Sequence, residues 1–100
     1  MLKNVRTYQI AITFHRNCRS VKLPDYLKDQ LLRASSSIAL NIAEGCGRST
    51  RKDQNRFFFQ ALGSLRESQA ALDLSPQEFP DLVKEADILG AHLYRLCHPK

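Results

Sequence analysis

Four basic side chains lie close together near the middle of the 100-residue chain: Arg48, Arg51, Lys52 and Arg56. Guanidinium and ammonium groups bind phosphate oxygens, and arginine offers them a planar fork of donors. Ser49 or Thr50, among these cations, can cap a helix, whose N-terminus adds backbone N–H donors and the positive end of the helix dipole. The cluster therefore predicts a binding site for anions, above all for phosphate groups.

Other reactive side chains are not spaced for catalysis. The three histidines, His15, His92 and His98, have no carboxylate or cysteine at a convincing metal-ligand spacing. The serines at 35–37 and Ser64 lack the flanking pattern of a nucleophile elbow, and no glycine-rich phosphate-binding loop is present. We therefore expect a non-enzymatic protein that uses neither a metal nor a cofactor.

The composition is that of one globular domain covering residues 1–100. Apolar residues make up 43% of the chain, charged residues make up 25%, and the net charge is +5. The odd set of cysteines, Cys18, Cys46 and Cys97, does not fit a disulfide framework or a zinc knuckle, so we expect a reducing cytoplasm. The first residues are too polar for a secretory signal, and no apolar run is long enough to span a membrane.

The elements that must position the cations are four helices. Apolar residues recur at three- and four-residue steps over about residues 3–19, 25–45, 50–74 and 75–96. The connections are short, so neighbouring helices must run antiparallel. The sequence therefore predicts an all-α, antiparallel up-down-up-down four-helix bundle.

Capping and packing signals refine these helices. The first helix should bury Val5, Tyr8 and Ile12, with Ala11 and Cys18 as further candidates for the same face. Gly45 and Gly47 can adopt the left-handed conformation that closes the second helix. Ser49 or Thr50 should cap the third helix, with Asp53 three residues after Thr50, and a capping serine followed by proline, Ser75-Pro76, should open the fourth.

Apolar side chains beyond one core-facing stripe indicate self-association. Phe57, Phe58 and Phe59 fan across about 200° of a helix, because successive residues differ by about 100°. Phe58 should face the core, which leaves Phe57 and Phe59 on opposite flanks. Subunit contacts would cover these flanks, as could long side chains of neighbouring helices in the same chain.

Antiparallel topology sorts the charges by end. One end should collect eight cations and two carboxylates, a net charge of +6: Lys3, Arg6, Arg48, Arg51, Lys52, Arg56, Arg95 and Lys100, with Glu44 and Asp53. The charges of the remaining residues add to −1. Such a field attracts nucleic acid, although a charge cluster can also be an ordinary solvated surface.

Several residues have expected structural roles around this end. Glu44 lies at a helix C-terminus, where a negative charge is disfavoured, so we expect an ion pair with Arg48 or with an arginine on another helix. Asn41 should bond across helices in the same layer as Ser64. Gly63 and Ser64 should let the third helix approach the small side chains of residues 34–39 closely.

A family resemblance is carried by four short strings: Leu32-Arg33-Ala34-Ser35, Asn41-Ile42-Ala43-Glu44-Gly45, Gly47-Arg48 and Ala61-Leu62-Gly63-Ser64-Leu65-x-Glu67. They resemble the signature of the four-helix-bundle proteins encoded within intervening sequences of 23S ribosomal RNA genes, sometimes labelled ribosomal proteins. That family is similar in fold to the accessory variability determinant of diversity-generating retroelements. The resemblance implies a homopentameric barrel whose basic surface binds nucleic acid and a reverse transcriptase.

The favoured function is an oligomeric accessory protein that binds RNA or DNA, with structured RNA as the expected ligand. Its phosphate contacts would come from six cations: Lys3, Arg6, Arg48, Arg51, Lys52 and Arg56. The alternative is a protein-interaction scaffold whose basic end meets an acidic protein partner, such as a reverse transcriptase.

Overall fold

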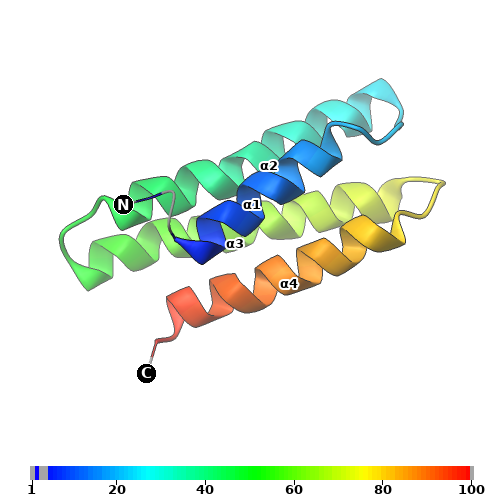
Figure 1. Ribbon diagram of the computed structural model, residues 1–100. Coiled ribbons are helices and arrows are strands. Elements are labelled where there is room, and N and C mark those ends of the chain that lie inside the picture. Colours follow the sequence, from blue (N-terminus) through cyan, green and yellow to red (C-terminus); the bar gives the residue numbers. More distant parts are fainter. Residues whose placement is uncertain (1, 3–4, 100) are drawn as a thin grey trace.

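Four helices dominate the computed structural model, which describes residue 2 and residues 5–99. They are α1 (Arg6–Cys18), α2 (Asp25–Cys46), α3 (Arg51–Leu74) and α4 (Pro80–Cys97). Successive helices point in alternating directions along a rod of 42 × 21 × 20 Å (Figure 1). The described residues form no strand, so the prediction of an all-α fold with four helices is confirmed.

Each helix packs against two neighbours. The contacting pairs are α1–α2, α2–α3, α3–α4 and α1–α4, and α2 and α3 lie together over the greatest length (Figure 1). The α1–α2 and α3–α4 connections lie at one end of the rod, while the α2–α3 bend and both termini lie at the other. None of the described helices combines the length and the apolar character required to cross a membrane.

Local signals placed two helix starts correctly. Pro24 directly precedes α2, where a proline has no helical hydrogen bond to lose. Thr50 caps α3, because its hydroxyl oxygen accepts a hydrogen bond of 3.2 Å from the Asp53 backbone N–H. The predicted cap at the basic cluster is therefore confirmed.

Other predicted helix ends were wrong. Helix α4 begins at Pro80, because the Ser75 hydroxyl accepts from the Gln77 backbone N–H at 3.1 Å within a turn that precedes the helix. Helix α2 continues to Cys46 and ends at Gly47 in the right-handed conformation (φ −85°), with the Gly47 amide bonded back to the carbonyls of Ala43 and Glu44. No described glycine has a positive φ, so the expected left-handed cap does not occur.

The core side chains are mostly those that the periodicity indicates. Phe58 is buried, as predicted, and α4 buries Leu82, Ala86, Leu89 and Leu93. The predicted face of α1 was partly right: Ala11 and Cys18 are buried, whereas Val5, Tyr8 and Ile12 are only partly buried. The residues that α1 buries are Thr7, Ala11, Phe14 and Cys18. This stripe has the same helical period but is centred on Phe14, whose large ring is completely enclosed.

The α2–α3 contact contains a close approach and a polar layer. A β-carbon on Gly45 would lie 2.6 and 2.8 Å from two carbons of the Phe58 ring, so only glycine fits there. Ser37 Oγ lies 2.8 Å from Ser64 Oγ, and Asn41 Nδ2 donates to the Ser37 carbonyl (2.9 Å) and hydroxyl (3.0 Å). Asn41 is therefore in the predicted layer, but it bonds within α2 and reaches α3 only through Ser37.

Gly63 does not have the packing role that the sequence indicates. It is exposed, and nothing lies within 4 Å of the position that its β-carbon would occupy. Ser64, the next residue, is the one that turns towards α2. The prediction for Ser64 is therefore confirmed and the prediction for Gly63 was wrong.

Candidate nucleic-acid interface

Two contacts bring the helix ends that carry the predicted cations together at one end of the rod. The Arg51 guanidinium, in the first turn of α3, donates through Nη2 to the Leu96 carbonyl in the last turn of α4. Leu2 and Val5, which precede α1, share a hollow with Ala43 and Cys46 from the end of α2. The start of α1, the end of α2, the start of α3 and the end of α4 therefore meet at this end, and these are the helix ends that carry the predicted basic residues.

We call this end of the molecule the basic end and define it by its described cations: Arg6, Arg48, Arg51, Lys52, Arg56 and Arg95. Lys3 and Lys100, which were predicted to join them, lie outside the described residues. Together with Glu44 and Asp53, the six cations give the basic end a net charge of +4. The other described charges, seven cations and eight carboxylates, add to −1.

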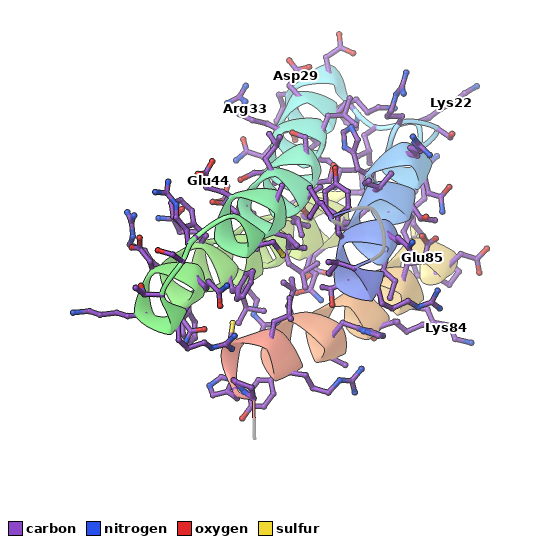
Figure 2. All side chains as sticks on the ribbon, turned by 60° about the vertical axis from the view of Figure 1, so that its left-hand side comes forward. Lys22, Asp29, Arg33, Glu44, Lys84 and Glu85 are labelled. Carbon is purple, nitrogen blue, oxygen red and sulfur yellow. The ribbon has the colours of Figure 1, made fainter. Side chains whose placement is uncertain are left out.

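At the α2–α3 bend, two arginines share one aromatic ring. The guanidinium carbons of Arg48 and Arg56 lie 4.7 and 4.5 Å from the centroid of Phe57. Arg48 Nη2 also contacts Glu44 Oε2 at 2.7 Å, which confirms the ion pair predicted for Glu44 (Figure 2). Arg56 Nη2 lies 3.5 Å from Asp53 Oδ1. The ring holds both guanidinium groups in place, and the exposed carboxylates add little to that hold.

Arg51 has a structural function besides its charge. In addition to its bond to the Leu96 carbonyl, its Nη1 lies 3.5 Å from Gln54 Oε1. Its positive charge also compensates the negative end of the α4 dipole. Gln54 in turn donates through Nε2 to the Arg48 carbonyl at 3.2 Å, which ties the bend to α3. Arg51 thus links the two helices that end and begin here.

Lys52 and Arg56 lie on the outward face of α3. Both are exposed, and their four-residue spacing places them within about 40° of each other around the helix axis. Phe59, seven residues after Lys52, continues the same stripe and is 48% exposed. Lys52, Arg56 and Phe59 therefore form an exposed stripe along the start of α3.

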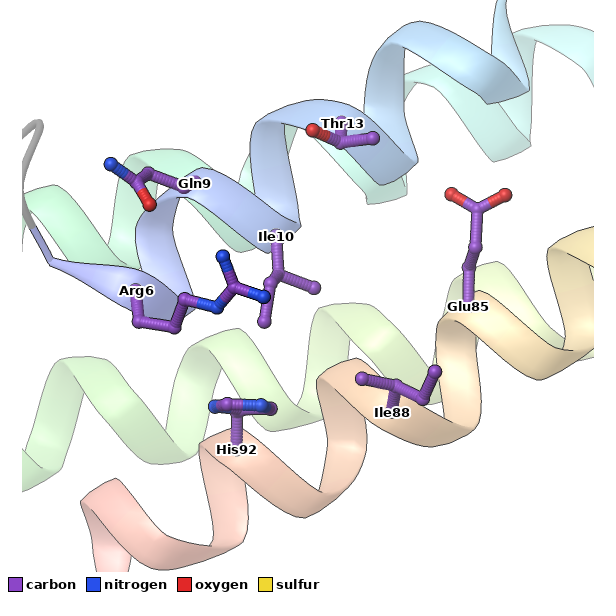
Figure 3. Close-up of a pocket in the computed structure, with 7 residues that line it drawn as sticks. All are labelled: Arg6, Gln9, Ile10, Thr13, Glu85, Ile88 and His92. Carbon is purple, nitrogen blue, oxygen red and sulfur yellow. The ribbon is translucent and has the colours of Figure 1, made fainter.

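Arg6 belongs to the α1–α4 side of the basic end. It faces His92 across a groove of about 310 Å³, which Ile10 and Ile88 also line (Figure 3). Burial lowers the pKa of His92, and the charges of Arg95 and Arg6 lower it further. Glu85, at the other end of the groove, accepts a hydrogen bond of 2.8 Å from Asn17 Nδ2. The structure thus brings Arg6 to the basic end, on a different helix contact from Arg48 and Arg56.

Sequence reasoning missed an aromatic cluster at the same end. The rings of Tyr94 and His98 are stacked, with centroids 4.1 Å apart and planes 25° apart. Phe59 meets His98 edge-on at 5.8 Å. The four-residue spacing of Tyr94 and His98 would bring them together on a helix, and it was the one signal in the sequence. Their contact with Phe59 joins α3 to the end of α4 and could not be read from spacing.

Neither the comparison with curated proteins nor that with solved structures gave a match. The family model described as 23S rRNA-intervening sequence protein matches residues 3–89, which include α1, α2, α3 and the first half of α4. That range contains all four strings on which the resemblance depends. The chain therefore belongs to the 23S rRNA-intervening sequence protein family.

Proposed function

We propose that this protein is a non-enzymatic, oligomeric accessory protein that binds nucleic acid, with structured RNA as the expected ligand, through its basic end. The observation that carries the proposal is the separation of charge along the rod, +4 at the basic end and −1 over the other described residues. A field of that polarity concentrates phosphates at one end of the molecule.

The chemistry of the α2–α3 bend supports this proposal. Arg48 and Arg56 are already oriented by Phe57, so less conformational entropy is lost when they bind a phosphate. Their carboxylate partners are about half exposed, and exchanging a surface carboxylate for a phosphate costs little. Lys52 and Arg6 would extend the contact to neighbouring phosphates. Lys3 lies outside the described residues and adds a cation three residues before Arg6 in the sequence.

Self-association is part of the proposal. Large apolar side chains exposed on the described surface include Leu40, Leu74, Val83 and Ile88. Subunits assembled side by side would cover such side chains and bring their basic ends into a ring. The resemblance to the retroelement determinant favours a homopentameric barrel. Light scattering should give a multiple of the 11.4 kDa chain mass, and a monomer would contradict this part of the proposal.

Titration of labelled RNA and DNA by fluorescence anisotropy tests the nucleic-acid binding. Four phosphate contacts should give a log–log salt dependence of about −3 to −4 between about 50 and 200 mM salt. Lys52→Glu with Arg56→Glu should weaken binding to every sequence and reduce that slope by about two. The matched control is Lys22→Glu with Lys84→Glu, which reverses two exposed cations outside the basic end. Equal losses from both pairs, or no binding at low salt, would contradict the proposal.

A second candidate is a scaffold for an acidic protein partner, such as a reverse transcriptase. The pairing of Arg48 with Glu44 and of Arg56 with Asp53 favours it, because these guanidinium groups already bind carboxylates. A partner that stays bound after nuclease treatment, and that Arg56→Glu releases, would support this function. The three free thiols favour a reducing compartment, so we place either activity in the cytoplasm.

A further inference from the structure

We propose that Phe59, Tyr94 and His98 form a stacking platform for unpaired bases, so that the ligand of the basic end includes single-stranded nucleotides. This inference rests on the proposed function, because it specifies which form of nucleic acid the basic end binds. We call these three residues the aromatic platform.

The aromatic platform is ordered and accessible. His98 is fixed to the last turn of α4, because its backbone N–H donates to the Tyr94 carbonyl at 2.9 Å and its Nδ1 lies 3.0 Å from the same oxygen. This arrangement holds its ring 4.1 Å from that of Tyr94. Phe59 and Tyr94 remain 48% and 58% exposed. Their rings therefore offer apolar faces to solvent without a change of fold.

Charge identifies the occupant of this surface as an anionic strand. Lys52 and Arg56 precede Phe59 on the same stripe of α3, and Arg95 follows Tyr94 directly. No acidic residue occurs at 54–66 or at 88–99, the two stretches that contain the aromatic platform. Asp53, which lies 3.5 Å from Arg56, is a carboxylate at the edge of this surface. An exposed aromatic surface with more cations than carboxylates around it has the composition of sites that stack bases and neutralise phosphates at once.

The local shape also suits a flat ligand. Gly63 follows Phe59 by one helical turn on the same stripe, and the space above it is open. Gly63, which does not mediate the packing of α2 against α3, instead leaves room for a base on the surface.

Stacking should contribute a measurable share of the affinity. Removing an aromatic side chain that stacks on a base typically weakens binding of a single strand about 5- to 150-fold. A base inside a duplex cannot stack on a protein ring, since both of its faces are occupied. The effect should therefore depend on the form of the nucleic acid, whereas phosphate contacts act on all forms.

The experiment compares three probes of matched phosphate number: a single-stranded RNA of about 12 nucleotides, an RNA duplex, and an abasic strand with phosphates and no bases. Each is titrated by fluorescence anisotropy at one fixed salt concentration against the full chain and against Tyr94→Ala and Phe59→Ala. Tyr26→Ala is the matched control, because Tyr26 is a 73% exposed tyrosine at the start of α2, at the opposite end of the rod. Tyr94→Phe keeps the ring and removes only the hydroxyl.

We expect Tyr94→Ala and Phe59→Ala to weaken binding of the single strand about 5-fold or more and to leave duplex and abasic binding within about 2-fold. Tyr26→Ala and Tyr94→Phe should bind all three probes as the unaltered chain does. If the platform variants bind all three probes unchanged, the platform is overturned while nucleic-acid binding stands. If no probe binds the unaltered chain, the proposed function fails as well. Circular dichroism confirms that each variant keeps its helices.

Discussion

The contact between α2 and α3 differs from the contact between α1 and α4. The first joins helices of 22 and 24 residues, brings Gly45 against the Phe58 ring, and contains the Ser37–Ser64 hydrogen bond. The second involves a helix of only 13 residues, α1, and leaves a groove of about 310 Å³ (Figure 3). Residues 30–37 of α2 and 64–67 of α3 also border a hollow of about 220 Å³, but near the bend the α2–α3 contact is close, whereas the α1–α4 contact is partly open to solvent.

The difference separates a rigid part of the molecule from an adaptable part. The close approach of Gly45 to Phe58 fixes the bend that presents Arg48 and Arg56, so these guanidinium groups have a defined position relative to Phe57. The α1–α4 contact positions only Arg6 and His92, across a groove. We infer that the bend keeps its geometry when the protein binds a ligand or a second subunit, while α1 and α4 can adjust.

The largest expected difference concerns two isoleucines. Ile42 of α2 is fully buried, and Ile42→Ala should lower the free energy of unfolding by about 2–5 kcal/mol, because it removes packed methyl groups and leaves a cavity. Ile88 in the α1–α4 groove is 46% exposed, so Ile88→Ala should cost less than about 1 kcal/mol. Urea denaturation measures both. A cost at Ile88 as large as that at Ile42 would mean that another subunit fills the groove.

Local spacing predicted much of this arrangement, and the rotation of helices about their axes limited the rest. The Thr50–Asp53 cap and the Glu44–Arg48 ion pair depend on neighbours three or four residues apart, so the sequence alone located them. Gly45 and Gly63 are the same residue type on similar helices. Which of them touches another helix depends on how α2 and α3 are rotated, and that is decided by packing between distant residues.

The same limit applies to the candidate site. Antiparallel connections place one end of each of the four helices at the same end of the rod, which was sufficient to predict the basic end. The bond from Arg51 to the Leu96 carbonyl and the contact of Phe59 with His98 both join α3 to α4. Neither follows from periodicity, since residues on one face of a helix can meet several positions on its neighbour.

The two glycines provide the second test of the comparison, with effects of opposite sign. In Gly45→Ala the new β-carbon would overlap the buried Phe58 ring, which should destabilise the protein by about 1–3 kcal/mol. Gly63→Ala adds a methyl group in open space within α3 and should stabilise the helix by up to about 1 kcal/mol. Urea denaturation of both variants gives the difference. A destabilised Gly63→Ala protein would indicate a neighbour at this surface, such as a second subunit.

The smallest expected effect is a dependence on pH that acts through the α1–α4 contact. Because burial and the cations Arg95 and Arg6 lower the pKa of His92 from 6.5, the folded protein disfavours its protonated form. The unfolded chain has no such restriction, so it binds more protons once the pH falls below about 6.5. The stabilisation by neutral His92 is complete above that pH and is lost as the pH falls to the lowered pKa.

Hydrogen exchange can assign this loss to one helix contact. Below pH 6.5 the amides of α1 and α4 that flank the groove should lose protection before those of α2 and α3, after correction for the intrinsic rates. His92→Gln should remove this difference, because the substituted side chain cannot acquire a charge opposite Arg6. His15→Gln is the control. Burial and Arg19 also lower the pKa of His15, but its Nδ1 lies 2.7 Å from Ser35 Oγ of α2, so it reports on a different helix contact. If His15→Gln rather than His92→Gln restores the protection of α1, then the acid-sensitive contact is α1–α2, and the groove is not the weak part of the bundle.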